Sequence, residues 1–300
     1  MSSSLPPFAL FCMVSLILPI TGRGMVSAAS RCNGHEALCS RKYSQIAQIG
    51  AHNSAFVGDL PSDNQYVSAT EILDIGLRFL QTQTQKWIDG IQMCHTSCLL
   101  LDAGPLADFL TPIKDWLDDH PNEVVTLLLT NPDAVPVTDF ADVFTAVGLD
   151  SYTYAPSPKL AMDEWPTLKS LIDANTRLVV FMDYHADTAK VPFILDQFAY
   201  MFETPFDTTD PSFAQCDLDR PEGASPDGRM YLVNHYLDID LFGILIPDQG
   251  AAPITNSVSS ILAQSDLCRE KWGRLPNFIL LDWANIGEAI AAQNELNGLL

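Results

Sequence analysis

The stretch Val124-Val125-Thr126-Leu127-Leu128-Leu129 is an almost unbroken apolar run. Such a run is typical of a parallel strand that is buried on both faces. Alternation of strand and helix over a chain of this length predicts an α/β fold, namely a (β/α) barrel of the TIM type. The strand-like stretches, with helical patterns between them, are 45–50, 76–83, 123–130, 177–183, 229–235 and 277–282.

The organisation of the chain predicts one barrel domain over residues 30–300. We find no Ser/Gly run, charge block or low-complexity stretch that would separate two domains. Active sites of (β/α) barrels form where the strands end at their carboxyl side. The polar residues at or just beyond such ends are His52, Gln83, His95, Thr130, Asp183, His235 and Asp282.

Residues 1–29 have the pattern of a secretory signal peptide. The apolar core at 8–20 is too short to span a bilayer, and Val26-Ser27-Ala28 is a small-residue cleavage pattern. A retained membrane anchor is the alternative. We therefore expect a secreted, extracellular protein without a stable membrane anchor.

Six of the seven cysteines remain after removal of the signal peptide, which suits an oxidising compartment. Their spacing suggests the disulfides Cys32–Cys39, Cys94–Cys98 and Cys216–Cys268. Zinc binding is the alternative, but these cysteines do not form two close Cys-x-x-Cys pairs. A Cys94–Cys98 disulfide would hold His95 on a short, rigid turn.

The charge of the chain argues against binding of nucleic acid and against strong electrostatic attachment to anionic lipid. Sixteen basic residues stand against 37 acidic ones, for a net charge of −21. Clusters of Lys and Arg, on which nucleic-acid binding depends, are absent. The same balance disfavours strong attachment to anionic lipid. We expect a soluble monomer that binds no nucleic acid.

Two histidines are the strongest functional signal. His52 lies in Ile49-Gly50-Ala51-His52-Asn53-Ser54, and His95 lies in Cys94-His95-Thr96-Ser97-Cys98, each after an apolar, strand-like stretch. Two imidazoles at the ends of two strands can face one cleft and divide the acid and base roles near neutral pH. The alternative for each is a structural histidine held by hydrogen bonds.

The sequence around these histidines resembles that of a known family. The run Gln48-Ile49-Gly50-Ala51-His52-Asn53-Ser54 resembles the first block of the phosphatidylinositol-specific phospholipase C X-domain-like phosphodiesterases, and Met93-Cys94-His95 resembles the third. The resemblance spans about residues 32–297, in the right order, and is closest to the secreted fungal branch. The other matching blocks are Gly76-Leu77-Arg78-Phe79-Leu80, Pro121-Asn122-Glu123-Val124-Val125-Thr126, Trp165-Pro166-Thr167-Leu168, Arg177-Leu178-Val179-Val180-Phe181 and Pro276-Asn277-Phe278-Ile279.

The resemblance implies a distorted barrel and a phosphoric diester hydrolase. It assigns the base role to His52 and the acid role to His95, with an internal hydroxyl of an inositol head group as the nucleophile. Asp282 follows a strand and could accept a hydrogen bond from His52, which would fix its tautomer. The alternative for Asp282 is a loop carboxylate that caps a turn.

The chain departs from the family at the positions that supply positive charge. Metal-dependent relatives have carboxylates where this chain has Gln81, Gln83 and Thr130, and bacterial metal-free relatives have an arginine at the position of Gln83. Asn53 matches a metal ligand of the family, but Ca²⁺ prefers six to eight oxygens with several carboxylates. We therefore expect catalysis without a cofactor, with Ca²⁺ possible but disfavoured.

Another cation would have to replace the missing charge. Side chains alternate along a strand, so Arg78 points away from Gln81 and Gln83 and is expected to be structural. Lys86 and a protonated His185 are the remaining candidates, although both are equally consistent with solvated loop residues.

A substrate site is expected at the ends of these strands. Trp283, Tyr236 and Tyr184 could stack on a sugar ring there, with packing at the rim as the alternative. The expected substrate is a phosphodiester, including a phosphoinositide lipid. The alternative function is a non-catalytic relative that binds a phosphorylated or sugar ligand in the same cleft. The expected substrate-binding residues are Asn53, Gln81, Gln83, Thr130 and Trp283.

Overall fold

The computed structural model describes residues 1–2, 31–88 and 90–299. The predicted signal peptide, apart from residues 1 and 2, lies outside the described residues. Within them, no helix is both long enough and apolar enough to cross a membrane.

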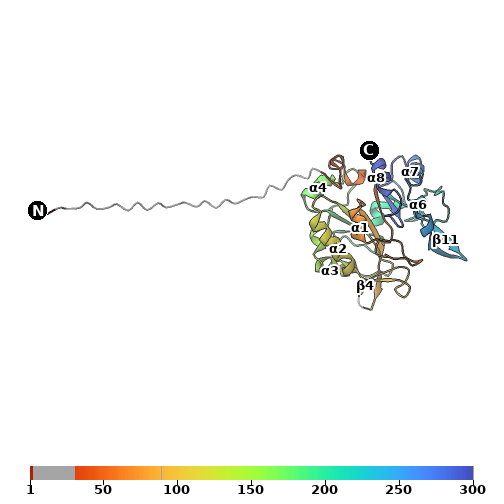
Figure 1. Cartoon of the computed structure of the whole chain (residues 1–300), viewed down its shortest axis with the longest axis horizontal. Coiled ribbons are helices and arrows are strands. Elements are labelled where there is room, and N and C mark those ends of the chain that lie inside the picture. Colours follow the sequence, from red (N-terminus) through yellow and green to blue (C-terminus); the bar gives the residue numbers. More distant parts are fainter. Residues whose placement is uncertain (3–30, 89, 300) are drawn as a thin grey trace.

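One curled, parallel sheet of eight strands forms the centre of the fold (Figure 1). Its order is β8-β7-β6-β2-β1-β13-β10-β9, so the sheet is not closed between β8 and β9 in the described chain. This confirms the predicted distorted barrel. The strands are β1 (Gln48–Ala51), β2 (Phe79–Gln83), β6 (Val125–Thr130), β7 (Leu178–Met182), β8 (Ile194–Asp196), β9 (Met201–Glu203), β10 (Met230–Asn234) and β13 (Phe278–Leu281).

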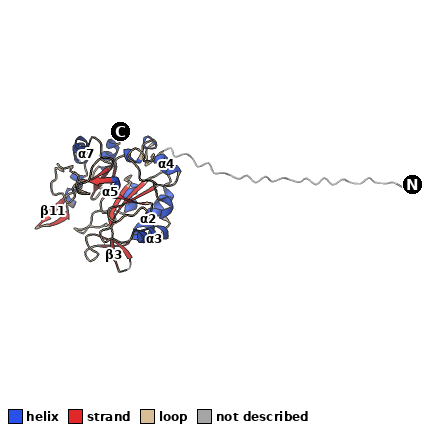
Figure 2. Cartoon of the chain, turned by 180° about the vertical axis from the view of Figure 1, so that it is seen from behind, coloured by secondary structure: helices blue, strands red, loops and turns tan. Residues whose placement is uncertain are grey.

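Helices cover the outer face of this sheet (Figure 2). Three of them begin at a side chain that caps the first turn. Ser68 caps α1 in a capping box with Glu71, Thr167 caps α4, and Ser257 caps α7. The helices are α1 (Ala69–Asp74), α2 (Leu106–Asp119), α3 (Val137–Ala146), α4 (Leu168–Asp173), α5 (Gln197–Tyr200), α6 (Ala252–Thr255), α7 (Val258–Trp272) and α8 (Ala289–Leu296). Short 3₁₀ turns occupy Glu36–Leu38, Tyr43–Gln45, Leu149–Tyr152 and Gln249–Ala251.

Alternation along the strands creates two buried layers. Leu80, Leu127 and Leu129 belong to the layer between the sheet and the helices. Phe79 and Leu128 point to the inside of the barrel, into a layer that also holds Tyr43, Trp165, Phe181 and Phe278. The ring of Tyr43 stacks on Trp165 at 4.8 Å between centroids. Aromatic side chains therefore fill the barrel below the carboxyl ends of the strands.

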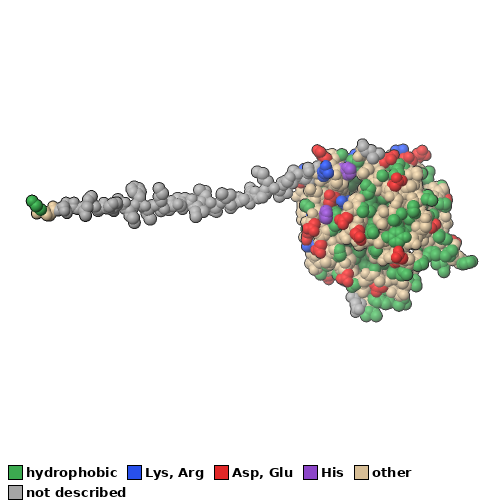
Figure 3. Space-filling model, viewed as in Figure 1, with side chains coloured by type: hydrophobic (Ala, Val, Ile, Leu, Met, Phe, Trp, Pro, Cys, Tyr) green, Lys and Arg blue, Asp and Glu red, His purple; other side chains and the backbone are tan. Residues whose placement is uncertain are grey.

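Two small antiparallel sheets were not predicted. β3 (Gln85–Trp87), β4 (Gly90–Cys94) and β5 (Asp102–Pro105) form one of them, and β11 (Asp238–Leu241) with β12 (Ile244–Pro247) form a hairpin. His95 thus follows β4, a strand outside the barrel. The hairpin projects from the body of the molecule, and apolar side chains gather at its outer end, where Phe242 is fully exposed (Figures 1 and 3).

All three predicted disulfides are present, which confirms the pairing inferred from spacing. The Cα–Cα distances are 5.0 Å for Cys32–Cys39, 4.8 Å for Cys94–Cys98 and 5.2 Å for Cys216–Cys268. The zinc alternative is wrong for these cysteines, because each sulfur is already bonded.

Candidate active site

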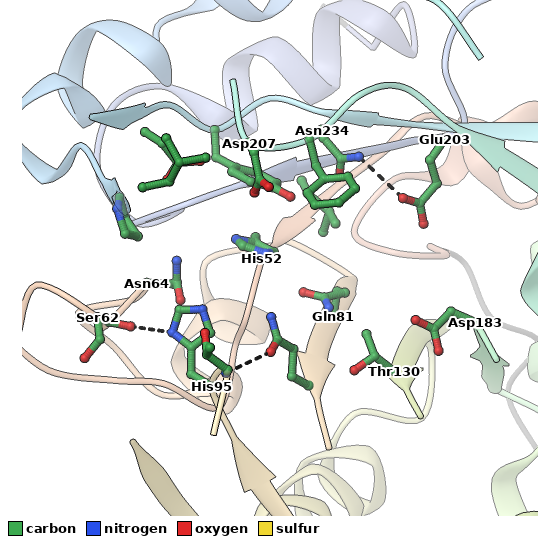
Figure 4. Close-up of a pocket in the computed structure, with 18 of the residues that line it drawn as sticks. His52, Ser62, Asn64, Gln81, His95, Thr130, Asp183, Glu203, Asp207 and Asn234 are labelled. Carbon is green, nitrogen blue, oxygen red and sulfur yellow. Dashed lines mark hydrogen bonds between the residues drawn. The ribbon is translucent and has the colours of Figure 1, made fainter. Parts of the chain in front are cut away.

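A cavity of about 510 Å³ opens at the carboxyl ends of the barrel strands. It is lined from almost every strand: β2 and β6 contribute to its floor, and residues at or after the ends of the other strands form its walls (Figure 4). The lining residues that can take part in chemistry or polar recognition are His52, Asn64, Gln81, Gln83, His95, Thr130, Asp183, Gln197, Glu203, Asp207, Arg220, Asn234, Tyr236 and Asp238.

His52 is oriented by a carboxylate below it. Its Nδ1 lies 2.8 Å from Oδ1 of Asp282, which is 4% exposed. An ionised carboxylate only accepts hydrogen bonds, so Nδ1 carries the proton and donates it. The imidazole also stacks on Tyr236, with ring centroids 3.9 Å apart and the planes parallel within 1°. The Nε2 lone pair of His52 is therefore left available as a base, the arrangement expected from the sequence.

His95 lies on the turn closed by the Cys94–Cys98 disulfide. Its Nδ1 donates to the carbonyl oxygen of Ser62 at 2.7 Å, and its ring stacks on Phe56 at 5.1 Å. Burial lowers the pKa of His95 and the neighbouring His52 lowers it further, against the opposing effect of the Ser62 carbonyl. His95 is therefore neutral in the ligand-free protein at ordinary pH.

A chain of two asparagines connects the histidines. Asn64 Nδ2 donates to Asp282 Oδ1 at 3.0 Å, and Asn64 Oδ1 accepts from Asn53 Nδ2 at 3.1 Å. Because the carboxylate only accepts, it fixes the orientation of both amides. Asn53 Nδ2 then faces His95 Nε2 at 3.2 Å, so this nitrogen accepts a hydrogen bond. The network holds His95 as the Nδ1–H tautomer.

The residues expected on the pocket face of β2 line the cavity. The backbone N–H of Asn53 donates to Gln81 Oε1 at 2.8 Å, and the N–H of Thr96 donates to Gln83 Oε1 at 3.2 Å. Both amide oxygens are thus occupied, which leaves both NH₂ groups as donors for a ligand. Thr130 also lines the cavity, and its Oγ1 has no hydrogen-bond partner among the described residues.

Two expected substrate-binding residues lie elsewhere. Asn53 is fully buried beneath the cavity and contacts it through its hydrogen bonds to Gln81, Asn64 and His95. Trp283 is also buried, at 2% exposure, and packs near Tyr66 with ring centroids 6.1 Å apart. It does not line the cavity, so the expectation that its indole stacks on a ligand there was wrong. Tyr184 is likewise absent from the lining, whereas Tyr236 lines the cavity.

The cavity is lined by one cation that the sequence did not mark, Arg220, and this guanidinium is paired with Glu203. Lys86 and His185 are exposed and do not line the cavity, so neither candidate was right. Arg78 forms an ion pair with Glu123 at 2.8 Å, outside the cavity, as its position on the strand predicted. Among the described residues that line the cavity, Arg220 is the one Lys or Arg.

Arg220 comes from the segment between β9 and β10, and Nη2 is 2.5 Å from Glu203 Oε2. Its guanidinium lies 4.4 Å over the ring of Phe206. Three further carboxylates line the same cavity, those of Asp183, Asp207 and Asp238. Burial raises the pKa of Asp183 and of Asp238 to about 7. Asp183 was noted from the sequence as a polar residue at a strand end, whereas no motif marks Glu203, Asp207, Arg220 or Asp238, which come from separate strands and irregular segments.

The residues present do not fit a Ca²⁺ site. Gln81, Gln83 and Thr130 supply neutral oxygens where carboxylates would be needed, and both glutamine oxygens already accept backbone N–H groups. Within the described part of the chain, no three His, Cys, Asp or Glu side chains are arranged to hold a metal ion.

Comparisons with known proteins point to one family. A family model described as PI-PLC X 1 matches residues 38–297. The PI-PLC X domain-containing protein 1 of Arthroderma benhamiae is 53% identical over 273 residues, which cover 89% of this chain and 90% of the relative. An uncharacterized secreted protein of the same fungus is 43% identical over 269 residues, which cover 85% of this chain and 60% of that protein's length.

Among solved structures, the phosphatidylinositol-specific phospholipase C of Listeria monocytogenes has a similar fold. Its TM-score is 0.57 at 16% sequence identity, and the match covers 87% of this chain and 97% of that one. At this identity the likeness concerns the fold alone.

Proposed function

This chain belongs to the PI-PLC X domain family, and from that premise we propose that it is a secreted phosphodiesterase that cleaves through His52 and His95. The observation that carries the proposal is the placement of both imidazoles on one cavity, each held by its own hydrogen bond at Nδ1. Two oriented imidazoles with different partners suit one base and one acid.

In the proposed reaction His52 is the general base. Its Nε2 takes the proton of a hydroxyl on the head group, and that oxygen attacks phosphorus. Asp282, 2.8 Å from Nδ1, stabilises the imidazolium that forms. The bond between phosphorus and the leaving oxygen breaks, which gives a cyclic phosphate and a free alcohol.

His95 is the proposed general acid. Its Nε2 faces the Asn53 amide in the ligand-free protein and is unprotonated. An anionic phosphate oxygen bound beside His95 favours the protonated imidazole, which takes up its proton from water at Nε2. The proton then passes from Nε2 to the leaving alcohol oxygen, and the NH₂ groups of Gln81 and Gln83 donate to the phosphoryl oxygens.

Secretion is part of the proposal. Three disulfides are characteristic of proteins from oxidising compartments. The relative named an uncharacterized secreted protein, 43% identical to this chain, adds support.

The experiment is a turnover assay of the purified protein on phosphatidylinositol vesicles and on a soluble inositol phosphodiester. We expect cyclic phosphate as the first product and a loss of at least about 10²-fold in His52→Ala and in His95→Ala, the scale of a lost general acid or base. Absence of turnover on every phosphodiester, together with binding of phosphate ligands that depends on His52, would favour the second candidate, a non-catalytic binding protein. The neutral residues Gln81, Gln83 and Thr130 are the observation in its favour.

A further inference from the structure

A second, much smaller cavity is lined by the carboxylate that orients His52. Its volume is about 10 Å³, which is the room that one water molecule needs. Asp282 and Trp283 line it from the end of β13, and Asn256 lines it from the segment between α6 and α7. The remaining lining residues are Tyr236, Leu237, Asp248, Ala252 and Thr255. Among the described residues, only Tyr236 also lines the cavity of about 510 Å³, so the small cavity is a separate site.

Three side chains of the small cavity each keep one polar atom without a partner in the described part of the chain. These atoms are Asp282 Oδ2, Trp283 Nε1 and Asn256 Oδ1. The three residues are 4%, 2% and 0% exposed, so bulk solvent does not satisfy the atoms. The other oxygen of Asp282 already accepts from His52 and Asn64. The amide nitrogen of Asn256 already donates to the carbonyl oxygens of Asp282 and Trp283. The unpartnered atoms are thus the ones left for an occupant of the small cavity.

These three atoms define the chemistry of the occupant. The indole Nε1 of Trp283 only donates, whereas the carboxylate oxygen of Asp282 and the amide oxygen of Asn256 only accept. The occupant must therefore accept one hydrogen bond and donate two. A metal cation or an ammonium group cannot accept from the indole, and an anion such as chloride cannot donate to either oxygen. A water molecule does both and matches the volume of the cavity.

The backbone at Trp283 is an independent sign that this arrangement matters. Its φ of 43° lies in the left-handed region, which a bulky side chain rarely adopts. Its N–H donates to the carbonyl oxygen of Asn64 at 2.7 Å, which holds the turn in place. Strain of this kind persists where the surroundings enforce it, and it is concentrated at functional sites. The turn brings the indole to the same small cavity as the preceding carboxylate of Asp282.

We propose that one water molecule binds in the small cavity, accepts from Trp283 Nε1, and donates to Asp282 Oδ2 and Asn256 Oδ1. The carboxylate of Asp282 is then held through both oxygens, since His52 and Asn64 bind Oδ1 and the water binds Oδ2. This fixes the plane of the carboxylate, and with it the direction in which Oδ1 accepts from His52. Trp283 is therefore a positioning residue that acts on His52 through the water and Asp282. The water site stands on geometry alone, whereas its effect on turnover rests on the proposed function.

The water site is tested by a crystal structure of the purified protein at a resolution that shows ordered water. We expect a single peak of density within about 3.2 Å of all three unpartnered atoms, the range of a hydrogen bond. Absence of density there would overturn the proposal. A peak at about 2.4 Å from the two oxygens would also overturn it, because that distance is typical of a metal cation.

Trp283→Phe tests the positioning role, because it removes the indole N–H and keeps an aromatic ring. Loss of one hydrogen bond of the water should lower kcat by about 3- to 10-fold. KM should stay unchanged, since Trp283 does not line the substrate cavity. Trp116→Phe is the matched control and should leave kcat unchanged. Its Nε1 also donates to a carboxylate, Asp74 Oδ1 at 2.7 Å, but Trp116 lines neither cavity.

Equal kcat for the two variants, or a rise in KM without a fall in kcat, would refute the positioning role of Trp283. The crystallographic test needs no variant, so the water site can be refuted even if Trp283→Phe does not fold.

The two experiments separate this proposal from the proposed function. Ordered water at the three atoms, in a protein without turnover on any diester, would refute catalysis and support the water site. Turnover that depends on His52, with no water at these atoms, would refute the water site and leave the proposed function intact.

Discussion

Asp282→Asn is expected to slow turnover only about 10-fold, far less than loss of His52 itself. Asp282 uses a single oxygen, Oδ1, to accept from both His52 and Asn64. Its Oδ2 has no partner among the described residues. An asparagine can keep Oδ1 in place and put its NH₂ group where Oδ2 was. The substitution therefore removes the charge and preserves the geometry.

The magnitude follows from this geometry. A hydrogen bond to a charged partner contributes about 1.5–3 kcal/mol, and one between neutral groups about 0.5–1.5 kcal/mol. The substitution therefore removes about 1–1.5 kcal/mol of stabilisation from the His52 imidazolium in the transition state. This loss corresponds to about 10-fold in kcat. Asp282→Ala also removes the acceptor that fixes the His52 tautomer, and its loss should approach the about 10²- to 10⁴-fold expected for His52→Ala.

The assay is the initial rate on a soluble inositol phosphodiester, with Tm measured for each variant. Asp173→Asn serves as the control, because this exposed carboxylate pairs only with Lys169 on the surface. If Asp282→Asn is as damaging as His52→Ala at unchanged Tm, then Oδ1 does not hold the tautomer as described, and the reasoning fails.

Three further predictions concern other parts of the site. Turnover should survive a chelator, because the floor of the cavity lacks carboxylates; its abolition by EDTA and recovery with Ca²⁺ would contradict this. Cys94→Ser with Cys98→Ser should lower kcat by about 10-fold at little cost in KM for a soluble substrate, since the disulfide positions the acid; an unchanged kcat would show that the turn keeps its shape without it. Asp183, whose pKa burial raises to about 7, is neutral below that pH and ionised above it. The KM for an anionic substrate should therefore rise as the pH rises through 7, with Asp238, whose pKa burial also raises to about 7, and with Glu203, Asp207 and Arg220 as the other charged groups that line the cavity. Asp183→Asn should reduce this rise, and a profile unchanged by that substitution would contradict the prediction.

The sequence was sufficient for six of the eight barrel strands and for the two histidines, but it did not predict the three-residue edge strands β8 and β9. Continuous apolar runs such as 124–129 predict buried parallel strands, and polar residues at their ends meet at one edge of the sheet. His52 and Asp282 could be paired on that ground alone. His95 was identified from its local motif, although it follows a strand of a small separate sheet.

The rest of the site depends on contacts that no local pattern records. Asn64 and Arg220 belong to irregular segments, and their partners Asp282 and Glu203 lie far away in the chain or on another element. Trp283 was misplaced because its position directly after a predicted strand was taken to direct the indole into the cavity. The backbone turns into a left-handed conformation there, with φ of 43°, and carries the indole away from the cavity.

Because the sheet is open between β8 and β9, the two sides of the site lie on strands that are paired to different extents. His52 and Asp282 lie at the ends of β1 and β13, adjacent strands that are paired on both sides within the sheet. Gln197 and Glu203 lie beside the gap. Gln197 follows β8, which is paired on one side only, and Glu203 ends β9, whose other side carries a single isolated bridge, to Arg220. Changes at Gln197 and Glu203 therefore disturb fewer strand pairings than changes at His52 and Asp282. Substitutions beside the gap can therefore alter this side of the cavity while His52 and Asp282 keep their positions.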